Sequence, residues 1–221
     1  MYNITLIGTR HEAAGKCNSD ELYKIIERIN PELIFEEIPP SLFAEYYTNK
    51  TRTNLETDTI NKYIETYKAE HILIDSDDVP SESFFWDYFN MLRRVEGLTD
   101  VNGFNYRNFI DRNRMYIETH GLQYLNSVHS ININDEITDA IEKGLGKLNS
   151  DKLNQTYKVW KEVNEKRENT WLQNIYSYSK EYSYDQAVFI VGAGHRKSLM
   201  QKIDDYEKKE KSKLNWGALK L

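Results

Sequence analysis

Residues 3–11 are Asn3-Ile4-Thr5-Leu6-Ile7-Gly8-Thr9-Arg10-His11, an apolar run that ends in glycine and polar side chains. A run of about four to eight apolar residues bounded by a turn signal is typical of a strand buried in a parallel sheet. We therefore predict a first strand over residues 3–8. Three more runs have the same character and predict three more strands: Glu32–Glu36, His71–Asp75 and Gln186–Val191.

Apolar residues at helical spacing lie between and after these strands. Between the first two strands, Ser19 or Asp20 can cap a helix, which predicts a β-α-β unit with parallel strands. Further helices are predicted at 54–68, 80–97, 104–127, 151–182 and after Gly194, with one more that ends at Gly144. A short closing strand can follow near residues 214–219.

The order of these elements predicts a single α/β domain over residues 1–221, with a central, mainly parallel sheet of about four to five strands. The helical residues from about 81 to 182 form an insertion before the C-terminal strand, and this insertion could cover the sheet as a lid. A chain of 221 residues is long enough to bury a substantial core without a disulfide.

Composition excludes several classes of function. The net charge is −6 and no basic stripe is present, so nucleic acid is not an expected partner. No apolar run approaches the roughly 20 residues that span a membrane, and the first residues enter a strand without a signal-like segment. The single cysteine, Cys17, cannot form an internal disulfide and fits a reducing compartment, so we expect a cytoplasmic protein. The oligomeric state stays open.

Two strands end in the same pattern, Gly-x-x-His. The first is Gly8 to His11, and the second is Gly192-Ala193-Gly194-His195, which leads into a helix. In an open α/β sheet, ligands bind at the carboxyl ends of the strands, where both histidines fall. Glycine allows a tight turn and close backbone approach to a ligand, and histidine can ligate a metal or act as a general base. The two turns are therefore predicted to form one site.

Carboxylates follow the second and third strands. Glu36 and Glu37 are consecutive, so they point to opposite faces and only one is expected to enter the site. Glu36 is that residue if Phe35 packs in the core and the alternation continues; otherwise it is Glu37. Two histidines and a carboxylate are a common ligand set for a divalent transition metal with an open coordination position. Further oxygen atoms follow the third strand, on Asp75, Asp77 and Asp78.

Each feature also has a plainer interpretation. The Gly192 to Gly194 turn can be a simple strand-to-helix connection or an anion-binding helix start, and Glu36-Glu37 can be solvated charges. The aspartates at 75–78 can cap the next helix. Three other histidines lack a comparable context and are predicted to be surface or packing residues, and Cys17 is predicted to be structural. The three are His71, His120 and His129.

These residues together resemble the TraB/Tiki and ChaN/erythromycin-esterase-like superfamily. The resemblance lies in Gly8 to His11, in Glu36 or Glu37 at a strand end, in Gly192 to His195, and in a helix with Arg167-Glu168-Asn169-Thr170-Trp171 before the second motif. It implies an α/β fold with both histidines facing one cleft. Tiki-type members imply a metal-dependent peptidase, erythromycin-esterase-like members imply hydrolysis with histidine as base, and ChaN-like members imply haem iron.

The chain departs from this family pattern in two ways. Arg196-Lys197-Ser198 follows the second motif, where TraB proteins commonly have Leu and Gly. The sequence also lacks a membrane segment, so a pheromone-processing or Wnt-type role is not carried over.

The favoured hypothesis is a metal-assisted hydrolase of peptidase or esterase type, acting on a small molecule or peptide. His11, Glu36 and His195 would hold Mn, Co or Zn or position a water directly, and Glu37 or Glu36 would be the base. Arg167 would stabilise the developing negative charge, or else form a surface salt bridge with Glu168 or Glu165. The turn glycines would let the backbone approach the ligand; these are Gly8, Gly192 and Gly194.

The alternative hypothesis is a protein without catalytic activity that binds haem, a metal or a partner protein. The aromatic helix from Phe84 to Phe89 and the tyrosines between residues 176 and 184 could line an apolar groove, although core packing also accounts for them.

Overall fold

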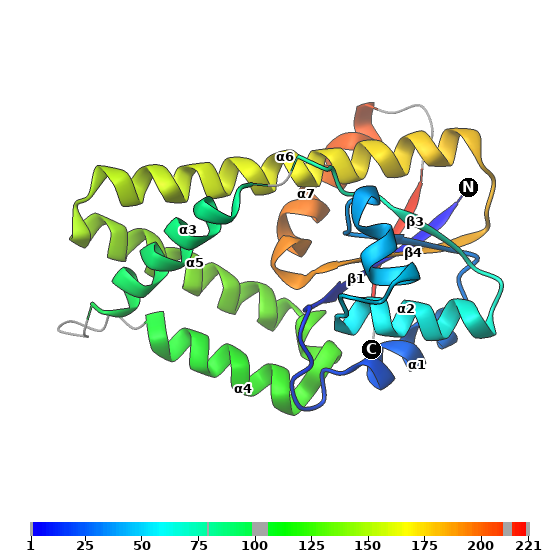
Figure 1. The fold of residues 1–221 in the computed structure, drawn as a ribbon, viewed down its shortest axis with the longest axis horizontal. Helices are drawn as coiled ribbons and strands as arrows, with labels where there is room; N and C mark the ends of the chain where they lie inside the picture. The colour runs from blue at the N-terminus through cyan, green and yellow to red at the C-terminus, as the bar shows by residue number, and fades with distance from the viewer. Residues whose placement is uncertain (1, 79, 99–105, 210–213, 220–221) are drawn as a thin grey trace.

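The computed structural model describes residues 2–78, 80–98, 106–209 and 214–219. Five parallel strands form one sheet in the order β3-β2-β4-β1-β5, which confirms the predicted fold class. The strand next to the C-terminal helix, β4, lies at the centre between β1 and β2 (Figure 1). The strand bounds are β1 Asn3–Thr9, β2 Leu33–Glu36, β3 Glu70–Leu73, β4 Gln186–Gly192 and β5 Asn215–Ala218.

Helices occupy most of the predicted positions, although the helix predicted to end at Gly144 continues through that glycine to Leu148. It ends there because Asn149 adopts a left-handed conformation, with a φ of 45°, and closes the last turn. Gly121 kinks α4, and the predicted start of this helix at 104–105 lies outside the described residues. The helices are α1 Ser19–Ile29, α2 Leu55–Thr66, α3 Glu82–Glu96, α4 Tyr106–Leu125, α5 Val128–Leu148, α6 Asp151–Glu181 and α7 Arg196–Lys209. Short helical turns are η1 Pro40–Leu42, η2 Ala44–Thr48 and η3 Ala193–His195.

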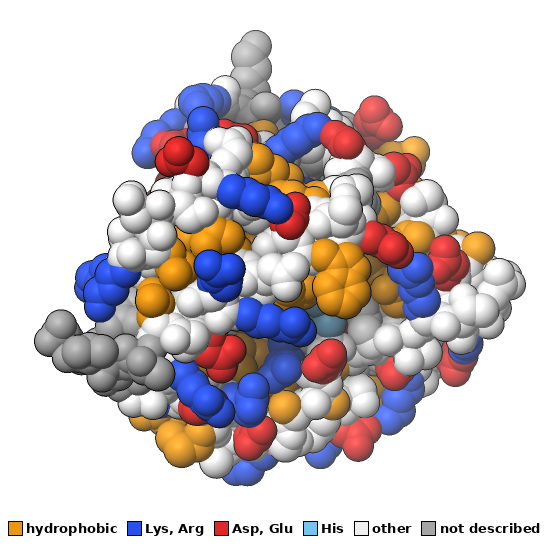
Figure 2. Space-filling view, turned by 60° about the vertical axis from the view of Figure 1, so that its left-hand side comes forward, with side chains coloured by type: hydrophobic (Ala, Val, Ile, Leu, Met, Phe, Trp, Pro, Cys, Tyr) orange, Lys and Arg blue, Asp and Glu red, His pale blue; other side chains and the backbone are white. Residues whose placement is uncertain are grey.

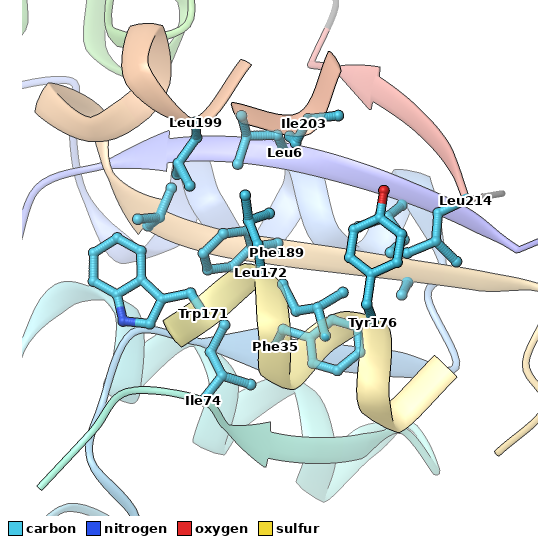
Figure 3. Packing of buried hydrophobic residues seen from close by; sticks show 14 of the residues in the cluster. Leu6, Phe35, Ile74, Trp171, Leu172, Tyr176, Phe189, Leu199, Ile203 and Leu214 are labelled. Carbon is cyan, nitrogen blue, oxygen red and sulfur yellow. The ribbon is translucent and has the colours of Figure 1, made fainter. Parts of the chain in front are cut away.

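Strand alternation divides the core between the two faces of the sheet. Phe35 and Phe189 pack with α6 and α7 on one face, whereas Ile34 and Ile190 pack with α1, α2 and α4 on the other. Figure 3 shows Trp171 and Tyr176 of α6 against the first of these faces. The sheet is therefore covered on both sides, as a parallel sheet requires.

The helical segment α3–α6 lies between β3 and β4 in the chain and extends to one side of the sheet (Figure 1). It has a hydrophobic cluster of its own, which includes Met91, Val95, Ile141 and Leu145. The 31-residue α6 is about 46 Å long at 1.5 Å per residue, and it joins the two parts. Its Tyr157 packs in the helical cluster and its Trp171 packs on the sheet.

The helical segment is fastened to the sheet at the end of α4. The Asn126 amide donates to the Gly8 carbonyl at 2.9 Å and accepts from the Gly8 N–H at 2.8 Å. The buried Arg196 guanidinium donates to the carbonyls of Leu125, Asn126 and Ser127 at 2.8, 2.8 and 3.3 Å. A Cβ atom on Gly8 would lie 2.3 Å from Arg196 Cδ, so this glycine is needed for close approach.

No helix in the described part of the chain is both long and apolar enough to cross a membrane.

Candidate active site

The two Gly-x-x-His turns lie side by side at the carboxyl edge of the sheet. Strands β1 and β4 are neighbours, and their register pairs Thr9 with Gly192, so both turns leave the sheet at the same level. Strand β2 ends beside them, with Glu36 paired to Ile190. The pairing of the strands therefore brings the two turns together at one edge of the sheet, as predicted.

Glu36 and Glu37 point to opposite faces, as their consecutive positions predict. Both are buried. Glu36 accepts a hydrogen bond from the Tyr47 hydroxyl at 2.5 Å and lies 2.9 Å from Nε2 of His71. Glu37 turns toward α6, where it accepts from Arg167 Nη2 at 2.7 Å and from the Gly192 N–H at 2.8 Å. Glu37 is thus the carboxylate that reaches the second motif. The expectation that a buried Phe35 would select Glu36 is wrong, because Phe35 packs in the core on the α6 side and Glu37, two residues later, lies on that same side.

His195 is held in one orientation by α6. Its Nδ1 lies 2.7 Å from Glu168 Oε1, and its ring meets Trp171 edge-on with centroids 4.9 Å apart. An ionised carboxylate can only accept, so this contact assigns a proton to Nδ1; in the neutral imidazole Nε2 then carries the lone pair. Nε2 lies 3.9 Å from Glu37 Oε1, and a water between these two acceptors could donate to both.

Glu168 is itself anchored from α7. Ser198 donates its hydroxyl to Glu168 Oε2 at 2.5 Å, and Lys202 Nζ lies 3.8 Å from the same oxygen. The carboxylate is buried, and these two contacts fix its position. Glu168 therefore acts toward His195 as an orienting carboxylate.

Arg167 joins two strand ends to α6. Its Nε and Nη2 donate to Asp75 Oδ2 at 3.1 and 2.7 Å, and Nη2 also donates to Glu37. The guanidinium carbon lies 4.9 Å from the centroid of the Trp171 ring. Burial would lower the pKa of Arg167, but Asp75 and Glu37 raise it above its ordinary value. The surface salt bridge to Glu168 or Glu165 is therefore the wrong interpretation, and Nη1 has no hydrogen-bond partner among residues that the structure describes.

The aspartates after β3 have separate roles. Asp75 is 2% exposed and accepts from Arg167, from Trp171 Nε1 at 2.7 Å and from the Ser76 N–H at 2.8 Å. Asp77 accepts from the Ser41 N–H at 3.2 Å, and Asp78 pairs with Lys166 at the surface. Only Asp75 joins the site.

His11 lies on the opposite side of the sheet edge, against α2. Its side chain is 60% exposed, and Nδ1 lies 3.5 Å from Glu56 Oε2. The Thr9 hydroxyl fixes the same carboxylate by donating to Oε1 at 2.6 Å. Contact with Glu56 raises the pKa of His11 from 6.5 to about 9. At neutral pH a metal ion would therefore have to displace a proton from His11 in order to bind it.

The free energy that the His11–Glu56 pair adds to folding is expected to disappear at high pH. Because the folded pKa of about 9 exceeds the ordinary 6.5, the contribution is complete below pH 6.5 and is lost as the pH rises through 9. The loss should be roughly 0.2–1 kcal/mol, since water screens a largely exposed imidazole. Urea unfolding of wild type and His11→Gln across this range measures it. Parallel stability curves for the two proteins would contradict the pairing.

A small pocket lies between the first motif and the two strand-end glutamates. His11, Glu36, Glu37 and Glu56 are among its lining residues, and its volume of about 10 Å³ has room for about one water. Within the described residues, Glu36 Oε1 and Glu56 Oε2 are buried without a hydrogen-bond partner.

The metal set predicted from the sequence is not gathered at one point. His11 faces Glu56, Glu36 faces His71 and His195 faces Glu168. In the ranges that the structure describes, no group of three or more His, Cys, Asp or Glu side chains is placed to hold a metal ion. Metal binding therefore stays a prediction.

Several contacts of the candidate site were not predicted from the sequence. Glu168 falls in helical register with the buried Trp171, Leu172 and Ile175, and a carboxylate on an apolar helix face is a detectable signal. Glu56 has the same relation to Ile60 and Tyr63 on α2. His71 was predicted to be a surface or packing residue, and it packs on Tyr47 while contacting Glu36.

His195 and Glu168 also line an open groove between α5, α6 and α7. The groove has a volume of about 750 Å³, within the range of small-molecule sites, roughly 300–1,000 Å³. Aromatic and basic side chains border it: Tyr157, Trp160, Lys161 and Lys202.

Comparison with known proteins adds no relative. No protein-family model matches the chain, and searches of curated proteins and of solved structures gave no match.

Proposed function

We propose that the chain is a hydrolase of ester or peptide bonds that uses His195 as general base. The observation that carries this proposal is the chain of contacts Glu168–His195–Glu37, with Nδ1 bonded at 2.7 Å and Nε2 3.9 Å from the second carboxylate. A base oriented by a third group beside an open groove is the arrangement that proton abstraction from water requires.

In this proposal, a water between His195 Nε2 and Glu37 attacks the carbonyl carbon of the substrate. Nε2 takes one proton of this water, and the carbonyl electron pair moves onto oxygen as the new C–O bond forms. The free Nη1 of Arg167 supplies donors for that negative charge. When the tetrahedral intermediate collapses, the His195 proton passes to the leaving oxygen or nitrogen, and a carboxylic acid and an alcohol or amine are released.

Glu37→Gln is expected to lower hydrolysis by roughly 10²-fold, because the amide has one acceptor oxygen in place of two and cannot accept from Arg167, the Gly192 N–H and the water together. The matched change Glu36→Gln, one residue away on the other face, should leave the rate within a few-fold. Turnover of 4-nitrophenyl acetate measures both. If only Glu36→Gln removes activity, the assignment of Glu37 is wrong.

A metal requirement follows from the family resemblance rather than from the placement of these side chains. Dialysis against a chelator, followed by addition of manganese, cobalt or zinc, tests it in the same assay. The proposed water chemistry expects activity to survive the chelator. Loss that a metal restores would instead favour the metal-assisted form of the hydrolase. A purified protein that absorbs at the haem band and hydrolyses no ester or peptide would favour the binding alternative.

A further inference from the structure

A second cavity lies on the other side of the turn that carries His195. It has a volume of about 310 Å³ and lies between α4, α5 and the two glycine turns. Both motifs contribute their middle residues to its wall: Thr9 and Arg10 from the first, and Ala193 and Gly194 from the second. The cavity is therefore built from the same turns as the proposed active site.

The polar lining of this cavity is basic and amide-rich. Arg10, Arg114, Asn113, Asn134 and Ser130 face it, and no Asp or Glu is among its described lining residues. This is notable in a chain whose net charge is −6. Figure 2, in which the helical end of the molecule comes forward, shows Lys and Arg side chains interspersed with Asp and Glu on that face.

The two arginines have little compensation for their charge. Arg114 is exposed, and across the described residues no carboxylate pairs with it. Arg10 Nη2 lies 3.8 Å from Glu12, a carboxylate that is 88% exposed and therefore well solvated. The first turns of α7 follow Ala193 and Gly194, and a helix start adds positive potential at this point.

We propose that this cavity binds an anionic oxygen group, a phosphate or a carboxylate, on the substrate of the proposed hydrolase. Arginine matches such groups because its planar fork can donate two parallel hydrogen bonds. Calling the bound group part of a substrate rests on the proposed function. Gly194 borders both this cavity and the groove of His195, so the two are neighbours. It specifies the substrate class: a small anionic ester or amide.

Calorimetric titration with inorganic phosphate and with succinate, at constant ionic strength, tests this site and distinguishes the two sources of negative charge. We expect saturable binding of one anion per chain by at least one of them. Arg114→Gln and Arg10→Gln should each weaken that binding about tenfold, and Arg114→Lys less than Arg114→Gln. Arg107→Gln is the control, because Arg107 lies on the same helix, outside the cavity, and is exposed.

The outcomes for the cavity and for the active site are separable. His195→Gln should bind the anion as the wild type does. If no ester or peptide is hydrolysed but the arginine variants lose the anion, the anion site stands and the hydrolase does not. If wild type binds neither anion saturably, or binds it equally with and without the two arginines, the anion site is wrong whatever the hydrolysis assay shows.

Discussion

Asp75→Ala is expected to lower the free energy of unfolding by roughly 3–5 kcal/mol. The reason is that one carboxylate, 2% exposed, accepts from both Arg167 and the Trp171 indole. Its removal leaves a mostly buried cation with Glu37 as its remaining partner and leaves an indole N–H without an acceptor. For a chain of this length, the melting temperature should fall on the order of 10 °C.

The control for Asp75→Ala is Asp78→Ala, which makes the same change three residues later. Asp78 is an exposed residue that pairs with Lys166, so its variant should melt with the wild type. Thermal melts followed by circular dichroism compare the two. Similar melting temperatures for both variants would contradict the role of Asp75 as the central acceptor of the network.

His195→Gln is expected to reduce ester hydrolysis by roughly 10²–10⁴-fold, the range of a lost general base. Glutamine can keep the hydrogen bond to Glu168 but cannot carry a proton from water to the leaving group. The rate with 4-nitrophenyl acetate measures the loss, and His120→Gln, an exposed histidine on α4, is the control. Equal rates for wild type and His195→Gln would remove His195 from the mechanism.

Stability is a poorer test of His195 than the sequence suggests. The position before a helix predicts a partly exposed histidine with few core contacts. The side chain is partly exposed, at 17%, but Glu168 and Trp171 pack against it. A moderate loss of stability is therefore expected whether or not His195 is catalytic, and only the rate distinguishes the two roles.

The strands and the edge that carries the site were predictable because their signals are local. The run from Ile4 to Gly8 and the run from Val188 to Gly192 specify buried strands ending in turns, and parallel strands place their carboxyl ends together. The position of β4 between β1 and β2 was not predicted, because strand order depends on contacts distant in sequence. The first two strands of the β-α-β unit are parallel but not adjacent.

The partners of each site residue were harder to predict than the residues themselves. Two histidines in matching motifs suggest a shared role, yet His11 contacts Glu56 on α2 and His195 contacts Glu168 on α6. Both acidic partners lie on helices whose packing against the sheet is set by apolar neighbours. The motif pattern alone has no information on which helix crosses which end of the sheet.

The close packing of Arg196 against Gly8 limits which parts of this chain can be removed. Arg196 passes over Gly8 without room for a Cβ atom and ends on the carbonyls of Leu125, Asn126 and Ser127. A version that lacks α4 and the residues directly after it would leave that guanidinium beside Gly8 without these acceptors. The sheet therefore cannot be transplanted as a free-standing module unless position 196 is redesigned at the same time.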